Sequence, residues 1–151
     1  LDRADRAGIK HVYIGKENFE HDLIKLLDEH EIDIIVLAGF LKILSSDFVS
    51  RYPDRIINVH PSLIPSFCGD GFYGLRVHEA ALSYGVKVTG ATVHFVNEVT
   101  DGGKIIAQRA VDVKDGDTPE ILQRRVMEEA EWKLLPAAVE KVAAEIVARR
   151  G

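Results

Sequence analysis

The sequence predicts an α/β protein whose doubly wound, mainly parallel sheet ends in an antiparallel pair of strands. In the first half of the chain, apolar runs that fit strands alternate with segments of helical spacing, and Gly or Pro residues separate them. Two later runs alternate polar and apolar residues and are joined through a Gly-Gly turn, as in a hairpin. A length of 151 residues with 46% apolar composition suffices for one domain with a sizeable core.

Two helices and two strands are predicted in the first 38 residues. Residues 1–8 are typical of the end of a helix that stops at Gly8. Residues 10–14 fit a short strand, and residues 18–30 have the apolar spacing of a helix. Residues 33–38 form a continuous apolar run, which is typical of a strand covered on both faces of a parallel sheet.

The next segment is predicted to complete a βαβ unit. Residues 45–52 form a short helix with a serine N-cap, and residues 56–60 form the second strand. The crossover between the two strands should be right-handed. Their carboxyl ends carry residues 39–44 and Asn58 to His60, and ligands of open α/β sheets bind outside such ends. We therefore expect the functional site at this edge.

The remaining chain is predicted to contribute two helices and the antiparallel strand pair. Residues 75–84 form a helix, and residues 87–96 and 105–113 alternate as paired strands do. A further helix begins at residues 117–120, with proline in its first turn. We expect Pro136 to kink or divide this long helix, because proline removes one helical hydrogen bond.

Three polar side chains are predicted to converge at the carboxyl edge of the sheet. Alternation along the strand puts Asn58 and His60 on one face, and Asp101 stands in the Thr-Asp-Gly-Gly segment between the later strands. An amide donor, a histidine that can be cationic and a carboxylate that can orient it suit negative charge developing on a carbonyl oxygen. Taken singly, Asn58 and His60 also fit hydrogen-bonded roles at a strand end, and Asp101 fits a turn.

Composition narrows the classes of function. The net charge is −5, and acidic and basic residues are interspersed, so we expect neither a nucleic-acid partner nor a membrane surface. Cys68 is the single cysteine, and neither a signal peptide nor a run of about 18 apolar residues is present. We therefore expect a soluble cytoplasmic protein, monomer or homodimer, that binds small molecules.

Several motifs together are specific enough to suggest a family. They are Asn-Val-His-Pro-Ser-Leu-Ile-Pro at residues 58–65, Gly-x-x-x-His-Glu-Ala-Ala-Leu at 74–82, Thr-Gly-Ala-Thr-Val-His-Phe-Val at 89–96 and Thr-Asp-Gly-Gly at 100–103. From about Ala4 to the C-terminus, the chain closely resembles the phosphoribosylglycinamide formyltransferase family. The resemblance implies a Rossmann-like formyltransferase fold. It also implies transfer of a formyl group from 10-formyltetrahydrofolate to the amine of glycinamide ribonucleotide, in de novo purine biosynthesis.

The resemblance assigns catalytic roles by matching position. Asn58 would donate its amide to the formyl oxygen, and His60 as imidazolium would stabilise the oxyanion. Asp101 would pair with His60 and assist proton transfer from the attacking to the leaving nitrogen, through a water molecule. The resemblance implies neither a metal nor a covalent intermediate.

Substrate-binding positions are also implied by the resemblance. The folate-binding residues would be Leu41, Lys42, Ile43, Leu44, Val96 and Lys16, together with Asn58 and Asp101. The ribonucleotide-binding residues would be Gly39, Pro61 and Glu131. On sequence grounds alone, residues 41–44 also fit a buried turn, Lys16 a solvated lysine and Glu131 a charge on a helix surface. The segment Ser66–Gly74 is longer than in many family members and could act as a flap.

The resemblance further predicts that residues 1–151 are one formyltransferase domain without its first structural unit. Leu1 is not an initiator, and the chain begins within a predicted helix. In the family, a strand, a glycine-rich phosphate loop and a helix come before this point. A unit of that size has roughly 30 residues or more.

Four rival functions remain as alternatives. The formyltetrahydrofolate hydrolase family typically has His-His-Ser where this chain has His60-Pro61-Ser62, and methionyl-tRNA formyltransferase needs an additional RNA-binding domain. A metal-binding module would use His60, His78, His94 and Asp101, which lack close ligand spacing. The fourth alternative is a folate-binding protein without turnover.

Overall fold

The computed structural model describes residues 1–151 and contains two compact units, Leu1–Ile32 and Asp33–Gly151. The first unit holds helices α1 (Asp2–Arg6) and α2 (Phe19–Glu29), so both helices expected there are confirmed. The strand expected at residues 10–14 is wrong, because this segment has no regular secondary structure. A strand needs a hydrogen-bonded neighbour, and this unit contains no strand with which the segment could pair.

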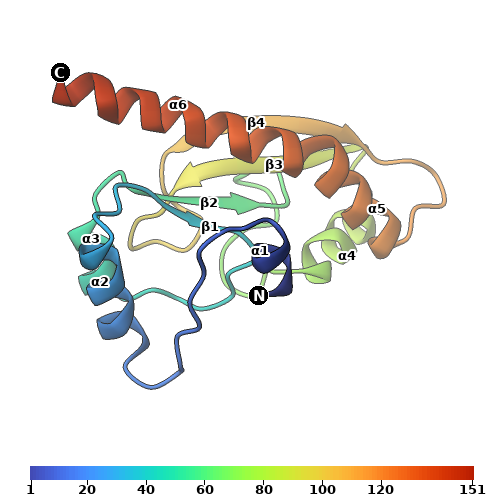
Figure 1. The fold of residues 1–151 in the computed structure, drawn as a ribbon. Coiled ribbons are helices and arrows are strands. Elements are labelled where there is room, and N and C mark those ends of the chain that lie inside the picture. The colour runs from blue at the N-terminus through green and yellow to red at the C-terminus, as the bar shows by residue number, and fades with distance from the viewer. The chain divides into compact units, whose positions relative to one another are not determined.

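The second unit is built on a four-stranded sheet with the order β1-β2-β3-β4 (Figure 1). Its strands are β1 (Ile35–Leu37), β2 (Ile56–His60), β3 (Val88–Phe95) and β4 (Ile105–Asp112). β1 and β2 are parallel, whereas the β2–β3 and β3–β4 pairs are antiparallel. The α/β class and the antiparallel β3–β4 pair are confirmed. The sheet of these residues is mixed rather than mainly parallel, because β3 returns alongside β2 in the opposite direction.

Helix α3 (Ser46–Arg51) connects β1 to β2 and confirms the predicted βαβ unit. The Ser45 hydroxyl accepts a hydrogen bond from the Phe48 backbone N–H at 3.1 Å, which satisfies one free donor of the first helical turn. Phe48 and Val49 are buried, so the helix packs its apolar side against the protein. This short crossover places the carboxyl ends of β1 and β2 at the same edge.

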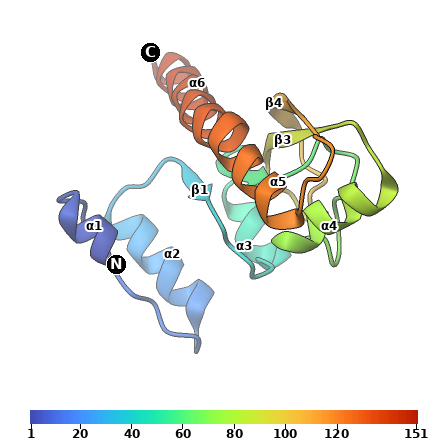
Figure 2. The same cartoon turned by 90° about the vertical axis from the view of Figure 1, so that its right-hand side faces the viewer.

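The C-terminal helical segment covers one face of the sheet (Figure 1, Figure 2). It consists of α5 (Pro119–Val126), the π-helical turn η1 (Met127–Glu131) and α6 (Trp132–Arg150). In α6, Ala138, Val142 and Ile146 pack with Ile57 and Val93 of the sheet. Burial of these aliphatic side chains is the main stabilising contribution of the long helix.

The irregularity expected at Pro136 lies one turn earlier. Helix α6 continues through Pro136, and the widened turn η1 ends at Glu131. Proline cannot donate to the carbonyl four residues before it, and its ring crowds that carbonyl. The preceding turn therefore absorbs the change in geometry, so the helix is divided before the proline and not at it.

Helix α4 (Leu75–Tyr84) ends at Gly85, which has a left-handed φ of 85°. Its residue Ala81 belongs to a second core cluster with Leu122 and Val126 of α5 and Ala91 of β3. The connection from β2 to α4 includes a cis peptide bond between Ile64 and Pro65.

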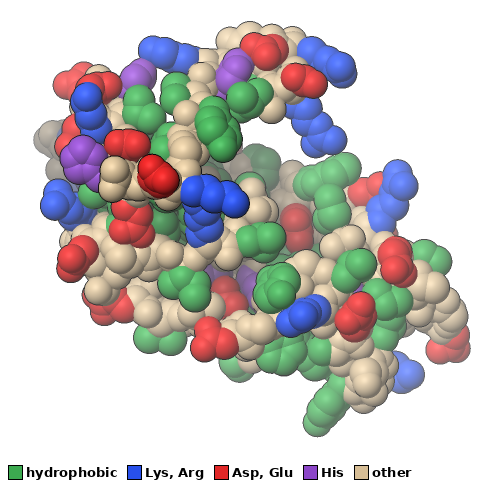
Figure 3. Space-filling view, turned by 90° about the horizontal axis from the view of Figure 1, so that it is seen from below, with side chains coloured by type: hydrophobic (Ala, Val, Ile, Leu, Met, Phe, Trp, Pro, Cys, Tyr) green, Lys and Arg blue, Asp and Glu red, His purple; other side chains and the backbone are tan.

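Acidic and basic side chains are intermixed on the face shown in Figure 3. None of the helices is long and apolar enough to cross a membrane.

An ion pair joins the start of α5 to its second turn and predicts a pH dependence of stability. The Asp117 carboxylate accepts hydrogen bonds from two Arg125 nitrogens at 2.5 and 2.7 Å and from the Lys114 backbone N–H at 2.8 Å. The Arg125 hydrogen bonds lower the pKa of Asp117 from 3.8 to about 2. A carboxyl group whose pKa is lower in the folded state than in the unfolded state stabilises the folded state at pH values above its unfolded-state pKa. This stabilisation is lost as the pH falls through the folded-state pKa.

We therefore expect Asp117→Asn to destabilise the protein at pH 6, because Arg125 loses its charged partner. The difference in unfolding free energy between the parent and this variant should shrink as pH falls from about 4 to about 2. Urea unfolding at several pH values measures this difference. The matched control is Asp115→Asn, an exposed aspartate of the same loop. If the difference in unfolding free energy between the parent and Asp117→Asn does not change with pH, the lowered pKa of Asp117 is contradicted.

Candidate functional site

A pocket of about 680 Å³ lies at the carboxyl ends of β1 and β2. The residues that line it are Leu37 of β1 and residues 39–44 after it, Val49 of α3, residues 58–61 at the end of β2, residues 69–74, His78 of α4, His94 of β3, residues 96–101 after β3, and the α5–η1 positions Gln123, Met127 and Glu131. All of these residues belong to the unit Asp33–Gly151. The structure therefore brings every predicted site residue except Lys16 to one cavity. Lys16 lies in the other unit.

Asn58 and His94 face each other across the β2–β3 pair and form a hydrogen bond. The Asn58 Nδ2 atom lies 3.3 Å from His94 Nε2, and His94 Nδ1 lies 2.9 Å from the Phe95 carbonyl oxygen. A carbonyl can only accept, so His94 Nδ1 carries the proton and Nε2 accepts from the Asn58 amide. This contact fixes which end of the amide is nitrogen. The second Asn58 N–H remains for a ligand in the pocket.

Burial keeps His94 neutral. Its ring is 2% exposed, and this loss of hydration lowers the pKa of His94, although the Phe95 carbonyl and Asp101 oppose the effect. Asp101 Oδ1 lies 3.8 Å from His94 Nε2. Because a neutral His94 presents a lone pair at Nε2, it offers the Asp101 carboxylate neither a hydrogen bond nor a positive charge. The carboxylate is therefore left to interact with His60.

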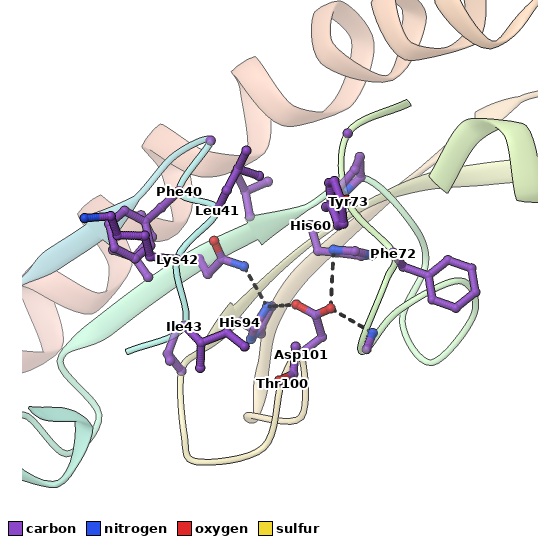
Figure 4. Close-up of a pocket in the computed structure, with 18 of the residues that line it drawn as sticks. Phe40, Leu41, Lys42, Ile43, His60, Phe72, Tyr73, His94, Thr100 and Asp101 are labelled. Atoms are coloured by element: carbon purple, nitrogen blue, oxygen red, sulfur yellow. Dashed lines mark hydrogen bonds and ion pairs between the residues drawn. The ribbon is translucent and has the colours of Figure 1, made fainter. Parts of the chain in front are cut away.

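His60 and Asp101 form a second polar contact of the site (Figure 4). Asp101 Oδ2 lies 3.6 Å from His60 Nδ1 and accepts the Gly69 backbone N–H at 2.9 Å. On the other side of the ring, His60 Nε2 donates to the Phe67 carbonyl at 2.8 Å. Both side chains are shielded from water, with 6% and 11% of their surfaces exposed. Electrostatic interactions at such a sheltered position are screened less by salt than those at the surface.

The backbone around Asp101 is tightly constrained. Asp101 has a positive φ of 53°, which is uncommon for a residue other than glycine. A Cβ atom at Gly103 would collide with the Phe95 carbonyl oxygen, and one at Gly102 would lie 2.6 Å from Val99 Cγ1. Gly103 thus permits this loop to approach the end of β3, and Gly102 permits a close contact with Val99 within the loop.

His78 is a further histidine of the pocket wall. It is 1% exposed, and its Nδ1 atom has no hydrogen-bond partner. Burial, together with the nearby His60 ring, lowers the pKa of His78 to about 4. The ring is therefore neutral at physiological pH and adds no charge to the site. No group of three or more His, Cys, Asp or Glu side chains is arranged to hold a metal ion.

The mouth of the pocket is apolar and largely exposed. Leu41 is 74% exposed, Ile43 82% and Val99 65%. Leu41 and Ile43 lie on one side of the cavity and Tyr73 on the other (Figure 4). Large apolar side chains gathered around a concave opening are typical of a surface that a ligand covers.

The remaining predicted positions line the cavity from different sides. Gly39 follows β1, Pro61 follows β2, and Glu131 ends the turn η1. Burial raises the pKa of the Glu131 carboxyl, so this residue is not simply a solvated helix charge. A π-helical turn often occurs at functional sites, and here it carries the acidic side chain to the pocket.

Sequence reasoning missed three groups that hold the site together. They are the His94 ring, the Phe67 carbonyl and the Gly69 N–H. His94 could have been found, because strand alternation in β3 and an antiparallel pairing with β2 place it opposite Asn58. No sequence pattern identifies the two backbone groups, since their positions depend on the path of the loop.

Comparisons with known proteins agree with this geometry. Residues 4–139 match the family described as "Formyl transferase". The chain is 47% identical over 149 residues to the human trifunctional purine biosynthetic protein adenosine-3, covering 95% of this chain and 14% of that protein. It is 49% identical over 114 residues to a phosphoribosylglycinamide formyltransferase of Mycobacterium tuberculosis, covering 76% of this chain and 50% of that protein.

A solved structure extends the comparison to the fold. The crystal structure of phosphoribosylglycinamide formyltransferase from Anaplasma phagocytophilum has a TM-score of 0.84 and 38% identity, and the match covers 94% of this chain and 67% of that one. The family match includes nearly the whole sequence and all three residues Asn58, His60 and Asp101. The chain therefore belongs to the formyl transferase family.

Proposed function

We propose that this chain provides the active site of a phosphoribosylglycinamide formyltransferase. The reaction transfers the formyl group of 10-formyltetrahydrofolate to the amine of glycinamide ribonucleotide, a step of purine biosynthesis. The observation that carries the proposal is the convergence of Asn58, His60 and Asp101 at one sheltered pocket with an apolar mouth. The identity to phosphoribosylglycinamide formyltransferases supports the choice of substrates.

The reaction requires stabilisation of an oxyanion. The amine nitrogen attacks the formyl carbon, and the carbonyl oxygen becomes negative before the bond to the folate nitrogen breaks. Asn58 has one N–H held by His94 and a second for this oxygen. His60, as imidazolium, stabilises the same charge. Preorganised donors in a site shielded from water stabilise such charge more than donors in bulk solvent do.

The reaction also requires a proton to move. Once the neutral amine has attacked, its nitrogen carries a positive charge and must lose a proton, and the folate nitrogen must gain one before it leaves. Asp101 is suited to this transfer through a water molecule, because it lies in the pocket beside His60, and its Oδ1 atom, which faces the neutral His94, accepts no hydrogen bond from that ring.

The two substrates would occupy different walls of the pocket. Leu41, Lys42, Ile43, Leu44 and Val96 would contact the folate, whose aromatic ring suits the apolar mouth. Gly39, Pro61 and Glu131 would contact the ribonucleotide, and the Glu131 carboxylate can accept hydrogen bonds from its hydroxyl groups. The family resemblance also assigns Lys16, in the other compact unit, to the folate tail. The family match spans both compact units, which supports one formyl transferase domain over residues 1–151.

The test is an assay of the intact protein with 10-formyltetrahydrofolate, with and without glycinamide ribonucleotide. We expect release of tetrahydrofolate that depends on the amine and equals the formylated product formed. Release of formate without the amine would instead identify a formyltetrahydrofolate hydrolase. Binding of folate in calorimetry without turnover in either condition would contradict the catalytic proposal and leave a folate-binding protein.

A further inference from the structure

A row of polar side chains crosses the sheet beneath the loop that follows His60. In the strand register, His60 of β2 lies opposite Thr92 of β3, and Thr92 lies opposite Gln108 of β4. Thr92 is completely buried, with 0% of its surface exposed. A buried hydroxyl within a sheet is costly unless it is hydrogen-bonded. The hydrogen-bond partners of the Thr92 hydroxyl therefore indicate its structural role.

The Thr92 hydroxyl makes three hydrogen bonds, two of which reach the loop. It donates to the Ser62 carbonyl at 2.7 Å and accepts the Ile64 backbone N–H at 3.1 Å. The third bond comes from Gln108 Nε2 at 3.0 Å, and the same amide nitrogen donates to the Ile64 carbonyl at 3.1 Å. One threonine and one glutamine thus attach the backbone of residues 62–64 to the sheet.

The attached segment leads directly to a contact with His60. The buried Ser62 hydroxyl donates to the Ser66 carbonyl at 2.5 Å, which closes the turn. The next residue, Phe67, supplies the carbonyl that accepts from His60 Nε2 at 2.8 Å. The ring is therefore oriented on one side by Asp101 and on the other by a carbonyl whose place depends on the turn.

We propose that Thr92, supported by Gln108, is a positioning residue for His60 and acts through the Ser62–Phe67 turn. Only the kinetic test of this inference rests on the proposed function. Thr92 forms no hydrogen bond with His60 and does not line the pocket. Its contribution is therefore to the orientation of the His60 ring. Small displacements of a catalytic group can reduce a rate by about 10²-fold.

The first experiment compares Thr92→Val with Thr92→Ser in the intact protein. Valine keeps the shape and removes all three hydrogen bonds, whereas serine retains the hydroxyl. We expect Thr92→Val to lower kcat about 10- to 100-fold with little change in the folate KM. Thr92→Ser should restore kcat to within about threefold of the parent. Thr89→Val is the matched control, because it makes the same change at another buried position of β3.

The second experiment does not depend on turnover. Hydrogen exchange of the Ile64 N–H should accelerate in Thr92→Val and not in Thr89→Val, since only the former loses its acceptor. The ring resonances of His60 in NMR spectra should shift in Thr92→Val and return in Thr92→Ser. Gln108→Leu should have a smaller effect on both, because Gln108 is exposed and water can replace its amide.

The outcomes separate the two proposals. Unchanged His60 resonances in Thr92→Val would overturn the positioning role, whether or not the Ile64 N–H exchanges faster. Equal losses of kcat in Thr92→Val and Thr89→Val would also overturn it, because the loss would then reflect general destabilisation. A parent without formyl transfer would contradict the proposed function, while the resonances of His60 would still decide the role of Thr92.

Discussion

His60→Ala is expected to lower kcat for formyl transfer by about 10²–10³-fold, which corresponds to roughly 3–4 kcal/mol of transition-state stabilisation. Asn58→Ala should cause a loss of the same order, because Asn58 would donate a hydrogen bond to the developing oxyanion whose charge the His60 imidazolium would stabilise. Folate affinity should change little in either variant, since the expected interaction forms only as the negative charge appears. Steady-state kinetics and calorimetry with a folate analogue measure the two quantities separately.

The control for this prediction is His30→Ala, which removes an exposed histidine at the C-cap of α2 that does not line the pocket. It should leave kcat close to that of the parent. Thermal unfolding of all variants shows whether the fold is retained. A His60→Ala protein that is folded and keeps more than about a tenth of the parental kcat would remove His60 from the mechanism.

Asp101→Asn is expected to reduce kcat about 10²-fold or more, because it removes the charge that pairs with His60 at 3.6 Å. The asparagine can still accept the Gly69 N–H, so the loop should stay in place. If Asp101 acts through His60, the double variant Asp101→Asn/His60→Ala should be little worse than the more damaging single variant. Kinetics of the four proteins complete this double-mutant cycle.

Independent roles would give a different result. The losses of the two single variants would then multiply in the double variant, and the proposed coupling between Asp101 and His60 would be wrong. Asp115→Asn serves as a charge-matched control, because this exposed aspartate of the β4–α5 loop does not line the pocket. Its kcat should equal that of the parent within experimental error.

Local patterns predicted most helices and strands, because each leaves a signal within a few residues. The serine N-cap of α3 and the Thr118-Pro119 start of α5 are examples in which a side chain and a backbone N–H meet within one helical turn. The strand expected at residues 10–14 failed for a non-local reason. The local pattern of residues 10–14 fits a strand, but a strand forms only where a partner strand lies beside it.

The helix break shows a similar limit. Pro136 predicts an interruption, but the sequence does not say on which residues the strain falls. In the structure the turn η1 before it widens, and this carries Glu131 to the wall of the pocket. The choice depends on the packing of α5 and α6 against different parts of the sheet.

The sequence by itself determined the α/β class, the order of the elements from residue 18 onward and the placement of Asn58 and His60 on one face of β2, since these depend on local periodicity. It also indicated Asp101 through its motif. Only the tertiary structure decided what holds these side chains. His94 orients Asn58 across 36 residues of sequence, and Gly69 binds Asp101 across 32. Such contacts arise from strand pairing and loop path, which no short segment of sequence encodes.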